Sequence, residues 1–346
     1  MKLSLCIPQY NRIEFLLKGL AIIEQQSFPD IEVVISDDCS TDSTEADITA
    51  LIPKYKYPLI YHRNATNQGY DRNYRKCIEL STGEYVIILG NDDTINPEYD
   101  LQNLVDFLDS NNYPELGFAN FIEEANDNFF VERAQVTGML GSDYQTAMRY
   151  YSCFSFVGGL IYRKDSFDRF NSDKHDGSIY AQMYMGCLMV ASGSRLFSVH
   201  EPMVIKDIVV SKSIRNTYAD TLAKNWKQYR VETGGLISVM HVLIDAFRDA
   251  GKLSQGLIYF IFKRIYTVTY PFWIISYKEK GSFAAAWGLV SGLKPHKNHN
   301  LRLLNTWNRF KIRTYYLIFS IVALMTPVFV FNAVKNRLYK SVKRRS

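Results

Sequence analysis

The segment Glu84–Asp93, which reads Glu-Tyr-Val-Ile-Ile-Leu-Gly-Asn-Asp-Asp, constrains the fold of this chain more than any other. Its apolar run has the length and β-branched content of a buried strand, and it stops at polar residues. Open α/β sheets bind ligands at the carboxyl ends of such strands. Asp92 and Asp93 repel each other unless a cation lies nearby, and Mg²⁺ typically takes one or two carboxylates together with substrate phosphates. The segment therefore predicts a metal–phosphate site or, since Asn and Asp favour turns, an ordinary strand-to-turn junction.

Strand and helix patterns alternate through the first 120 residues. They lie at 3–8, 13–23, 31–36, 59–62, 70–80, 85–89 and 96–108. A βαβα order is typical of a mostly parallel sheet with helices on its faces. We therefore expect an α/β fold of Rossmann-like type whose functional side chains gather at the carboxyl edge of the sheet.

Polar clusters follow three of these strands, at 8–12, 37–42 and 90–93. The carboxylates of Asp37 and Asp38 are suited to accept hydrogen bonds from a base imide or a ribose hydroxyl. Arg72 offers a planar fork to a base or a phosphate, and Gly69 allows close approach of the backbone. The pattern indicates a bound nucleotide, although neither a P-loop nor a dinucleotide fingerprint is present. The alternative for Arg72 and Asn73 is a pair on a helix surface with no role.

The net charge of +5 conceals a sharp division along the chain. Residues 257–346 hold 16 basic residues and one acid, which leaves 24 basic and 34 acidic residues in 1–256. This asymmetry predicts an acidic catalytic or binding domain joined to a basic region that associates with an anionic surface or partner. The five cysteines are scattered without a CxxC pair, which argues against a disulfide framework or a zinc site and suits a reducing compartment. No signal peptide is evident, because the first residues run directly into a strand pattern.

Residues 315–334 carry no charge, and twenty residues are enough to cross a hydrocarbon core of about 30 Å. Thr326-Pro327 interrupts this run, and basic residues flank both ends, so the charges set no orientation. A full span, an in-plane or re-entrant element, and a helix buried against the catalytic unit all remain open. Basic residues beside aromatic ones suit an anionic membrane surface. Nucleic acid would also suit the charge, but the long apolar runs favour lipid, so we expect no nucleic-acid partner.

Four sequence blocks together resemble glycosyltransferase family 2, whose members have the GT-A fold. The blocks are Ser4–Arg12, Glu32–Asp42, Asn67–Asn73 and Ser81–Asp93. The resemblance is strong over 1–110 and continues more faintly to about residue 207. It implies transfer of a sugar from a nucleotide-diphosphate donor, usually with inversion and with a divalent cation, Mg²⁺ or Mn²⁺.

The resemblance also implies which residues form the site. Donor binding would involve Pro8, Gln9, Tyr10, Asn11, Asp37, Asp38, Asn67, Gly69, Arg72, Asn91 and Asp92. Asp92 and Asp93 would hold the metal. The chain departs from the family at Gly90, where the DXD motif usually begins with an acid. One missing carboxylate is expected to weaken metal binding without abolishing it, because diphosphate and water oxygens complete the shell.

A second departure concerns the catalytic base. The helix predicted at 177–191 lacks the Glu-Asp pair with which the family deprotonates its acceptor. An inverting transfer needs a base within hydrogen-bond reach of the attacking hydroxyl. Asp176 is our first candidate and His175 the second. The alternative role for Asp176 is to cap the first turn of the helix.

These observations predict four regions. They are a nucleotide-sugar-binding half (1–110), an acceptor-side half (111–210), a helical connector (211–256) and a basic, aromatic, membrane-associating helical region (257–346). We expect a peripheral, monotopic or single-span glycosyltransferase on the cytoplasmic face of the cell membrane. It would act on a lipid-linked saccharide in surface polysaccharide or glycolipid synthesis. The alternatives are transfer onto polyprenyl phosphate and a non-catalytic sugar-nucleotide-binding scaffold, which the missing Glu-Asp pair supports.

Overall fold

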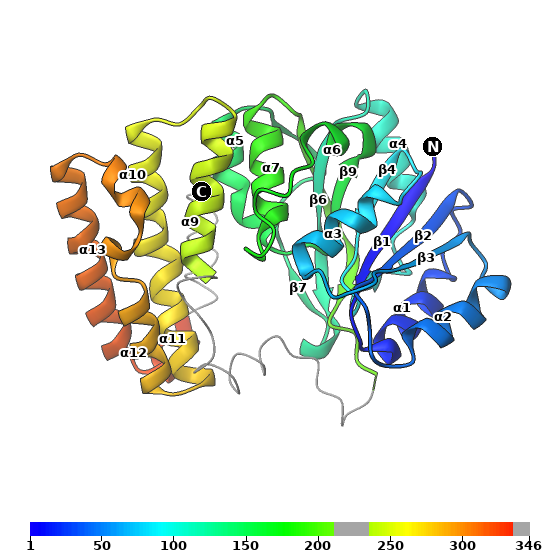
Figure 1. Ribbon diagram of the computed structural model, residues 1–346, viewed down its shortest axis with the longest axis horizontal. Coiled ribbons are helices and arrows are strands. Elements are labelled where there is room, and N and C mark those ends of the chain that lie inside the picture. Colours follow the sequence, from blue (N-terminus) through cyan, green and yellow to red (C-terminus); the bar gives the residue numbers. More distant parts are fainter. Residues whose placement is uncertain (211–234, 335–346) are drawn as a thin grey trace. The chain divides into compact units, whose positions relative to one another are not determined.

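The computed structural model describes residues 1–210 and 235–334. The chain divides into two compact units, Met1–Asn216 and Thr217–Ser346 (Figure 1). The first part of the predicted connector, 211–234, lies outside the described residues. So do residues 335–346, which hold six of the basic residues of the C-terminal region.

The first unit is built on a mixed ten-stranded sheet (Figure 1). Its strand order is β3-β2-β1-β4-β9-β6-β10-β5, with β7 beside β6 and β8 beside β10. The first four strands of this order run parallel, and they are β1 (Leu3–Gln9), β2 (Ile31–Asp37), β3 (Leu59–Arg63) and β4 (Tyr85–Ile88). The sheet becomes mixed at β9 (Leu160–Arg163), which is antiparallel to both β4 and β6 (Leu116–Glu123).

The other strands complete the far side of the sheet. They are β5 (Thr94–Ile95), β7 (Phe129–Val131), β8 (Gly138–Gly141) and β10 (Leu196–Lys206). Strand β10 runs parallel to β6 and antiparallel to β5 and β8. Its register shifts on both sides of Pro202, which bends the strand.

Helices cover the sheet, and local capping residues mark where some of them begin. They are α1 (Ile13–Ile23), α2 (Thr44–Leu51), α3 (Tyr70–Glu79), α4 (Leu101–Ser110), α5 (Tyr144–Tyr150), α6 (Lys164–Phe170) and α7 (Ala181–Ala191). Short 3₁₀ turns lie at Ile52–Lys54, Glu124–Asn126 and Tyr151–Ser155. The Asp100 carboxylate caps α4 by accepting the Gln102 N–H at 2.9 Å, and Asp143 caps α5 in the same way.

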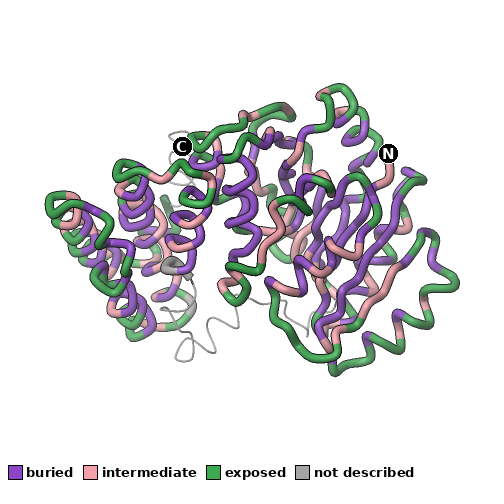
Figure 2. Tube along the Cα trace, turned by 45° about the horizontal axis from the view of Figure 1, so that its top comes forward, coloured by how far each residue is buried: buried purple, intermediate pink, exposed green. Residues whose placement is uncertain are grey.

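The central strands are buried on both faces, as Figure 2 shows. Side chains alternate along a strand, so Leu3, Leu5 and Ile7 join the large core cluster that includes residues of α1 and α4. Cys6 points to the opposite face, where its Sγ lies 3.4 Å from the carbonyl oxygen of Cys77 in α3. The parallel strands therefore read as continuous apolar runs and stop where the polar clusters begin.

Most element predictions for residues 1–110 are confirmed within one or two residues, but one helix of this segment and one helix beyond it begin later than expected. Helix α4 starts at Leu101 rather than near Asn96, because Thr94 and Ile95 pair with β10 as strand β5. Helix α7 starts at Ala181 rather than at Gly177.

The second unit is helical in its described part. Its helices are α9 (Gly235–Asp249), α10 (Gln255–Arg264), α11 (Tyr270–Lys280), α12 (Phe283–Gly292) and α13 (Thr306–Met325). A π-helical turn, Ile265–Thr269, joins α10 to α11, and 3₁₀ turns lie at Pro295–Lys297 and His299–Leu303. The buried rings of Tyr266, Tyr270 and Tyr316 have their centroids within 6.1 Å of one another and hold α13 against α11 and the π-helical turn before it.

One face of α13 packs inside this unit while the other is apolar and exposed. The exposed apolar side chains of this helix are 49% to 77% accessible: Trp307, Phe310, Leu317, Ile318, Ile321, Val322 and Met325. Among the described helices, none is by itself long and apolar enough to cross a membrane. Thr306–Met325 and Val328–Val334 satisfy that test only together, and they are bent by 102° at the predicted Thr326-Pro327 break.

Candidate functional site

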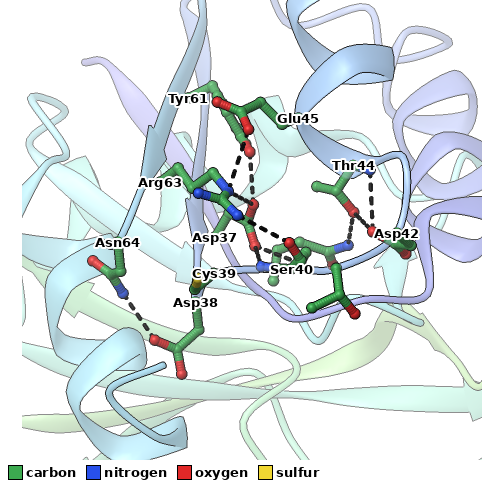
Figure 3. Close-up of polar contacts among 12 residues, drawn as sticks. Asp37, Asp38, Cys39, Ser40, Asp42, Thr44, Glu45, Tyr61, Arg63 and Asn64 are labelled. Carbon is green, nitrogen blue, oxygen red and sulfur yellow. Dashed lines mark hydrogen bonds and ion pairs between the residues drawn. The ribbon is translucent and has the colours of Figure 1, made fainter. Parts of the chain in front are cut away.

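Asp37, at the end of β2, organises the loop that follows it (Figure 3). Its carboxylate is buried and accepts the N–H of Ser40 at 2.9 Å and the hydroxyl of Tyr61 at 2.6 Å. The guanidinium of Arg63 lies between Asp37, at 3.7 Å, and Glu45, at 3.4 Å. Asp37 therefore fixes the shape of loop 38–42 through its neighbours.

Asp38 holds a second loop, the one that leads into α3. Its Oδ1 accepts the Gln68 N–H at 2.7 Å and the Asn64 side-chain amide at 3.0 Å, and its Oδ2 accepts the Gly69 N–H at 2.9 Å. Only 3% of the residue is accessible. Gly69 has φ +83°, a conformation that side chains rarely adopt, which explains glycine at the start of α3. The side chain of Asn67 also accepts the Gly69 N–H, at 3.1 Å.

The end of β1 joins these loops to the acidic turn after β4. Pro8 and the buried Gln9 close the strand. The N–H of Asn11 donates to the Ser40 hydroxyl at 2.7 Å, and its side chain accepts the Thr41 N–H at 2.8 Å. The Asn91 amide lies 3.4 Å from the carbonyl oxygen of Tyr10, whose ring is exposed. The three predicted polar clusters thus meet at one edge of the sheet.

Asn73 is a site residue whose importance the sequence did not reveal. It is buried, and its amide donates to the carbonyls of Gln9 at 3.2 Å and Ser36 at 2.8 Å, while its oxygen accepts the Ser36 hydroxyl at 2.7 Å. Asn73 therefore ties the carboxyl ends of β1 and β2 together, and the surface alternative is wrong for it. The guanidinium of Arg72 lies 3.0 Å from Glu79, toward the far end of α3.

The acidic pair follows β4 and differs in environment between its members. The Asp92 carboxylate is partly exposed and lies 3.1 Å from the Arg12 guanidinium. The Asp93 carboxylate is buried and accepts the N–H groups of Gly90 at 3.1 Å and Asp207 at 3.2 Å. Burial, together with the negative charges of Asp92 and Asp207, raises the pKa of Asp93 well above its usual range. The N–H of Ile208 adds a bond to the Asp92 carbonyl at 2.9 Å.

The acidic pair fits a hard divalent cation that carries phosphate oxygens. Asp92 and Asp93 offer carboxylates from one turn, and a cation would relieve the repulsion that disfavours the charged form of Asp93. No group of three or more His, Cys, Asp and Glu side chains placed to hold a metal occurs in residues 1–210 and 235–334. The remaining ligands would therefore come from a diphosphate and from water.

The segment before α7 lies against the first turns of α3. Both oxygens of Asp176 accept hydrogen bonds from the buried Arg75 guanidinium, at 3.0 and 2.6 Å. The alternative role of Asp176, as the cap of this helix, is wrong. Asp71 takes that role, because its carboxylate accepts the N–H groups of Ile179 at 2.7 Å and Ala181 at 3.1 Å. The ring of His175 packs on Tyr184, with centroids 4.4 Å apart.

Residues 4–170 match the family described as "Glycosyl transferase family 2". The chain therefore contains a glycosyltransferase family 2 domain. It is 31% identical over 222 residues to the abequosyltransferase RfbV of Salmonella typhimurium, a match that covers 59% of this chain and 66% of that protein. The chain thus spans less than two thirds of the length of RfbV. The predicted family is confirmed, and the relatives' names support the predicted enzyme class.

Solved structures of two other proteins share the fold of this chain. TarS 1-349 of Staphylococcus aureus, solved in complex with UDP, has a TM-score of 0.59 at 17% identity and covers 92% of this chain and 91% of its own. The mannosyltransferase PcManGT of Pyrobaculum calidifontis, solved with GDP-Man and Mn²⁺, has a TM-score of 0.50 at 16% identity, with 94% and 87% covered. At such identities the likeness shows the fold, and it confirms the predicted GT-A class.

Proposed function

We propose that this protein transfers a sugar from a nucleoside-diphosphate donor to a saccharide acceptor, with inversion and with a divalent cation. The observation that carries the proposal is the pair Asp92 and Asp93 at the end of β4, beside the loops that Asp37 and Asp38 hold in place. The family 2 domain supports the reaction class. The UDP complex of TarS and the Mn²⁺ complex of PcManGT support the donor class and the cation.

The donor would lie across the edge where β1, β2 and β4 end. Apart from Arg72, the residues that we assign to the donor lie in the strand ends and loops at this edge, and Tyr10 is exposed for contact with a base or ribose. Asp37 and Asp38 would act mainly by fixing loops 38–42 and 64–69, because their oxygens already accept hydrogen bonds from the protein. Arg72 would have to leave Glu79 to reach a bound nucleotide. We assign the acceptor side to residues 111–210.

The cation, when bound, would neutralise the charge that develops on the leaving diphosphate. Asp92 and Asp93 would hold it from the protein side. Deprotonation of the acceptor hydroxyl would fall to Asp176, with His175 as the second candidate. Asp176 would exchange one of its hydrogen bonds from Arg75 for a bond from that hydroxyl. The bidentate pair would otherwise hold the carboxylate in position.

We further propose that the acceptor is lipid-linked and that the protein acts at the cytoplasmic face of the cell membrane. The exposed apolar face of α13 supports this, as does the excess of basic residues in 257–346. Lys311, whose ammonium lies 5.2 Å from the Trp307 ring, would place charge beside an aromatic side chain, as anionic membrane surfaces favour. The bend after Met325 favours an in-plane or re-entrant arrangement over a straight span.

The second candidate function is a sugar-nucleotide-binding scaffold without catalysis. It is favoured by the ion pair that occupies Asp176 and by the absence of the family's Glu-Asp pair from α7. Transfer onto polyprenyl phosphate is the closer variant of the first proposal. It would use the same donor site.

The decisive experiment measures transfer and hydrolysis with UDP-, GDP- and dTDP-linked sugars, with Mn²⁺, in the wild type and in Asp92→Ala. We expect Asp92→Ala to lose roughly 100-fold or more in turnover, since metal charge stabilisation supplies several kcal/mol. Its stability should change by less than about 1 kcal/mol, because the lost ion pair with Arg12 is partly exposed. Asp168→Ala, which removes an exposed pair with Lys164, is the control.

Two results would contradict the proposal in different ways. Equal turnover in Asp92→Ala and wild type would refute the metal role. Tight donor binding by the wild type, with neither transfer nor hydrolysis across the panel, would favour the scaffold.

A further inference from the structure

Arg12 places a protein cation directly beside the acidic pair. It precedes α1 with φ +62°, and its guanidinium nitrogen lies 3.1 Å from the Asp92 carboxylate. The guanidinium carbon also lies 4.6 Å from the centroid of the Phe15 ring, on the buried side of α1. The side chain is thus held both by charge and by ring contact over the more accessible of the two acids.

The turn after β4 carries one acid fewer than the family motif, because Gly90 stands where that motif begins with an acid. An acidic side chain at this position would have no space. A Cβ at Gly90 would lie 2.7 Å from an oxygen of Asp93 and 3.0 Å from one of Asp92. An acid at position 90 therefore requires the pair itself to move. The carboxylate of the nearby Asp207 is paired with the Lys206 ammonium, which lies 2.7 Å away.

From these contacts we propose that Arg12 competes with the divalent cation for Asp92, so that the cation binds together with the diphosphate rather than before it. This inference rests on the proposed metal role of the acidic pair. A dication that approaches Asp92 alone meets a fixed positive charge within a few ångströms, and the described part of the chain offers it no group of three or more His, Cys, Asp or Glu ligands. A diphosphate brings further negative charge and oxygen ligands, which restore the attraction and give Arg12 another anionic partner.

The test measures binding of Mn²⁺ alone, by titration calorimetry and by the electron paramagnetic resonance signal of free Mn²⁺. We expect Arg12→Gln to bind Mn²⁺ at least fivefold more tightly than the wild type, because the competing charge is gone. Arg12→Lys keeps the charge and should stay within twofold of the wild type. The control is Lys164→Gln, which removes a cation paired with Asp168 at the opposite end of β4 and should change nothing.

A second measurement can be made on the wild type by itself and then repeated on the variant. In the wild type, UDP, GDP and dTDP are added in turn, and the best of them should tighten Mn²⁺ binding at least tenfold. In Arg12→Gln the same addition should tighten binding by a smaller factor. This arm keeps the inference testable if Arg12→Gln fails to fold, as judged by circular dichroism.

The outcomes separate this inference from the proposed function. Mn²⁺ binding that is equal in wild type and Arg12→Gln, or that no nucleotide tightens in the wild type, overturns the role of Arg12 and leaves the metal role standing. No binding of Mn²⁺ by any variant, with or without nucleotide, contradicts both.

Discussion

Glu32 offers a stability prediction whose size follows from its contacts. The residue lies in β2, at the amino end of the strand and far from the acidic turn, and it is 1% accessible. Its carboxylate accepts bonds from the Lys2 ammonium, the Ser4 hydroxyl at 2.6 Å, and the N–H and hydroxyl of Thr82, both at 2.6 Å. Burial alone would raise the pKa of Glu32, but these hydrogen bonds outweigh it and lower the pKa to about 2.

The lowered pKa makes this network a source of stability that depends on pH. A carboxylate whose folded pKa falls from 4.5 to about 2 contributes about 3 kcal/mol above the unfolded pKa. That contribution is lost as pH falls through the folded value. It should amount to about 1.5 kcal/mol at pH 3, by the same linkage relation.

The assay is urea unfolding of wild type and Glu32→Gln at pH 7, 4 and 3. Glu32→Gln should be less stable by about 3 kcal/mol at pH 7, which lowers the melting temperature of a domain of this size by roughly 6–12 °C. The difference should shrink to about half at pH 3. Asp168→Asn, which weakens an exposed ion pair, should change stability by less than about 0.5 kcal/mol. A loss that is the same at pH 7 and pH 3 would refute the electrostatic reasoning.

Two further predictions concern the site and the exposed helix face. Asn73→Ala should lower the free energy of unfolding by about 2–3 kcal/mol, because it leaves buried carbonyls and a hydroxyl of β1 and β2 unpaired. It should also weaken donor binding. Thermal unfolding and nucleotide titration check these effects, and an unchanged melting temperature would contradict the first. The double substitution Ile321→Glu and Met325→Glu should abolish sedimentation with vesicles that contain phosphatidylglycerol and leave stability within about 1 kcal/mol, since both side chains are exposed. The matched control is Phe129→Glu with Met139→Glu, which changes exposed apolar residues of the first unit, and equal vesicle binding by both double variants would reject the membrane face.

The sequence was most informative where a structural signal is local. Strands β1, β2, β3 and β4 each appear as an apolar run followed by polar residues, so their ends and the position of Asp37, Asp38, Asp92 and Asp93 at one edge could be predicted. Strand β5 was missed because two residues carry no periodicity, and its pairing with β10 depends on a strand about one hundred residues away.

The contacts that decide the chemistry were not predictable in the same way, because they join distant parts of the chain. The pair between Arg75 and Asp176 links residues 101 positions apart, and Asp71 caps a helix 110 positions away. Both contacts exist only because the segment before α7 lies along α3 in the folded protein. Arg12 belonged to a recognised block, yet its pairing with Asp92 required the ends of β1 and β4 to be neighbours.

The two amides that follow β10 bear on how this domain can be engineered. The N–H groups of Asp207 and Ile208 hold Asp93 and Asp92, although both residues lie beyond the segment 4–170 that matches the family. A chimera that grafts only the matched segment onto another scaffold would separate the acidic turn from the backbone that steadies it. To exchange donor preference between relatives, the transferred segment should therefore include the bend at Pro202 and the residues through 208.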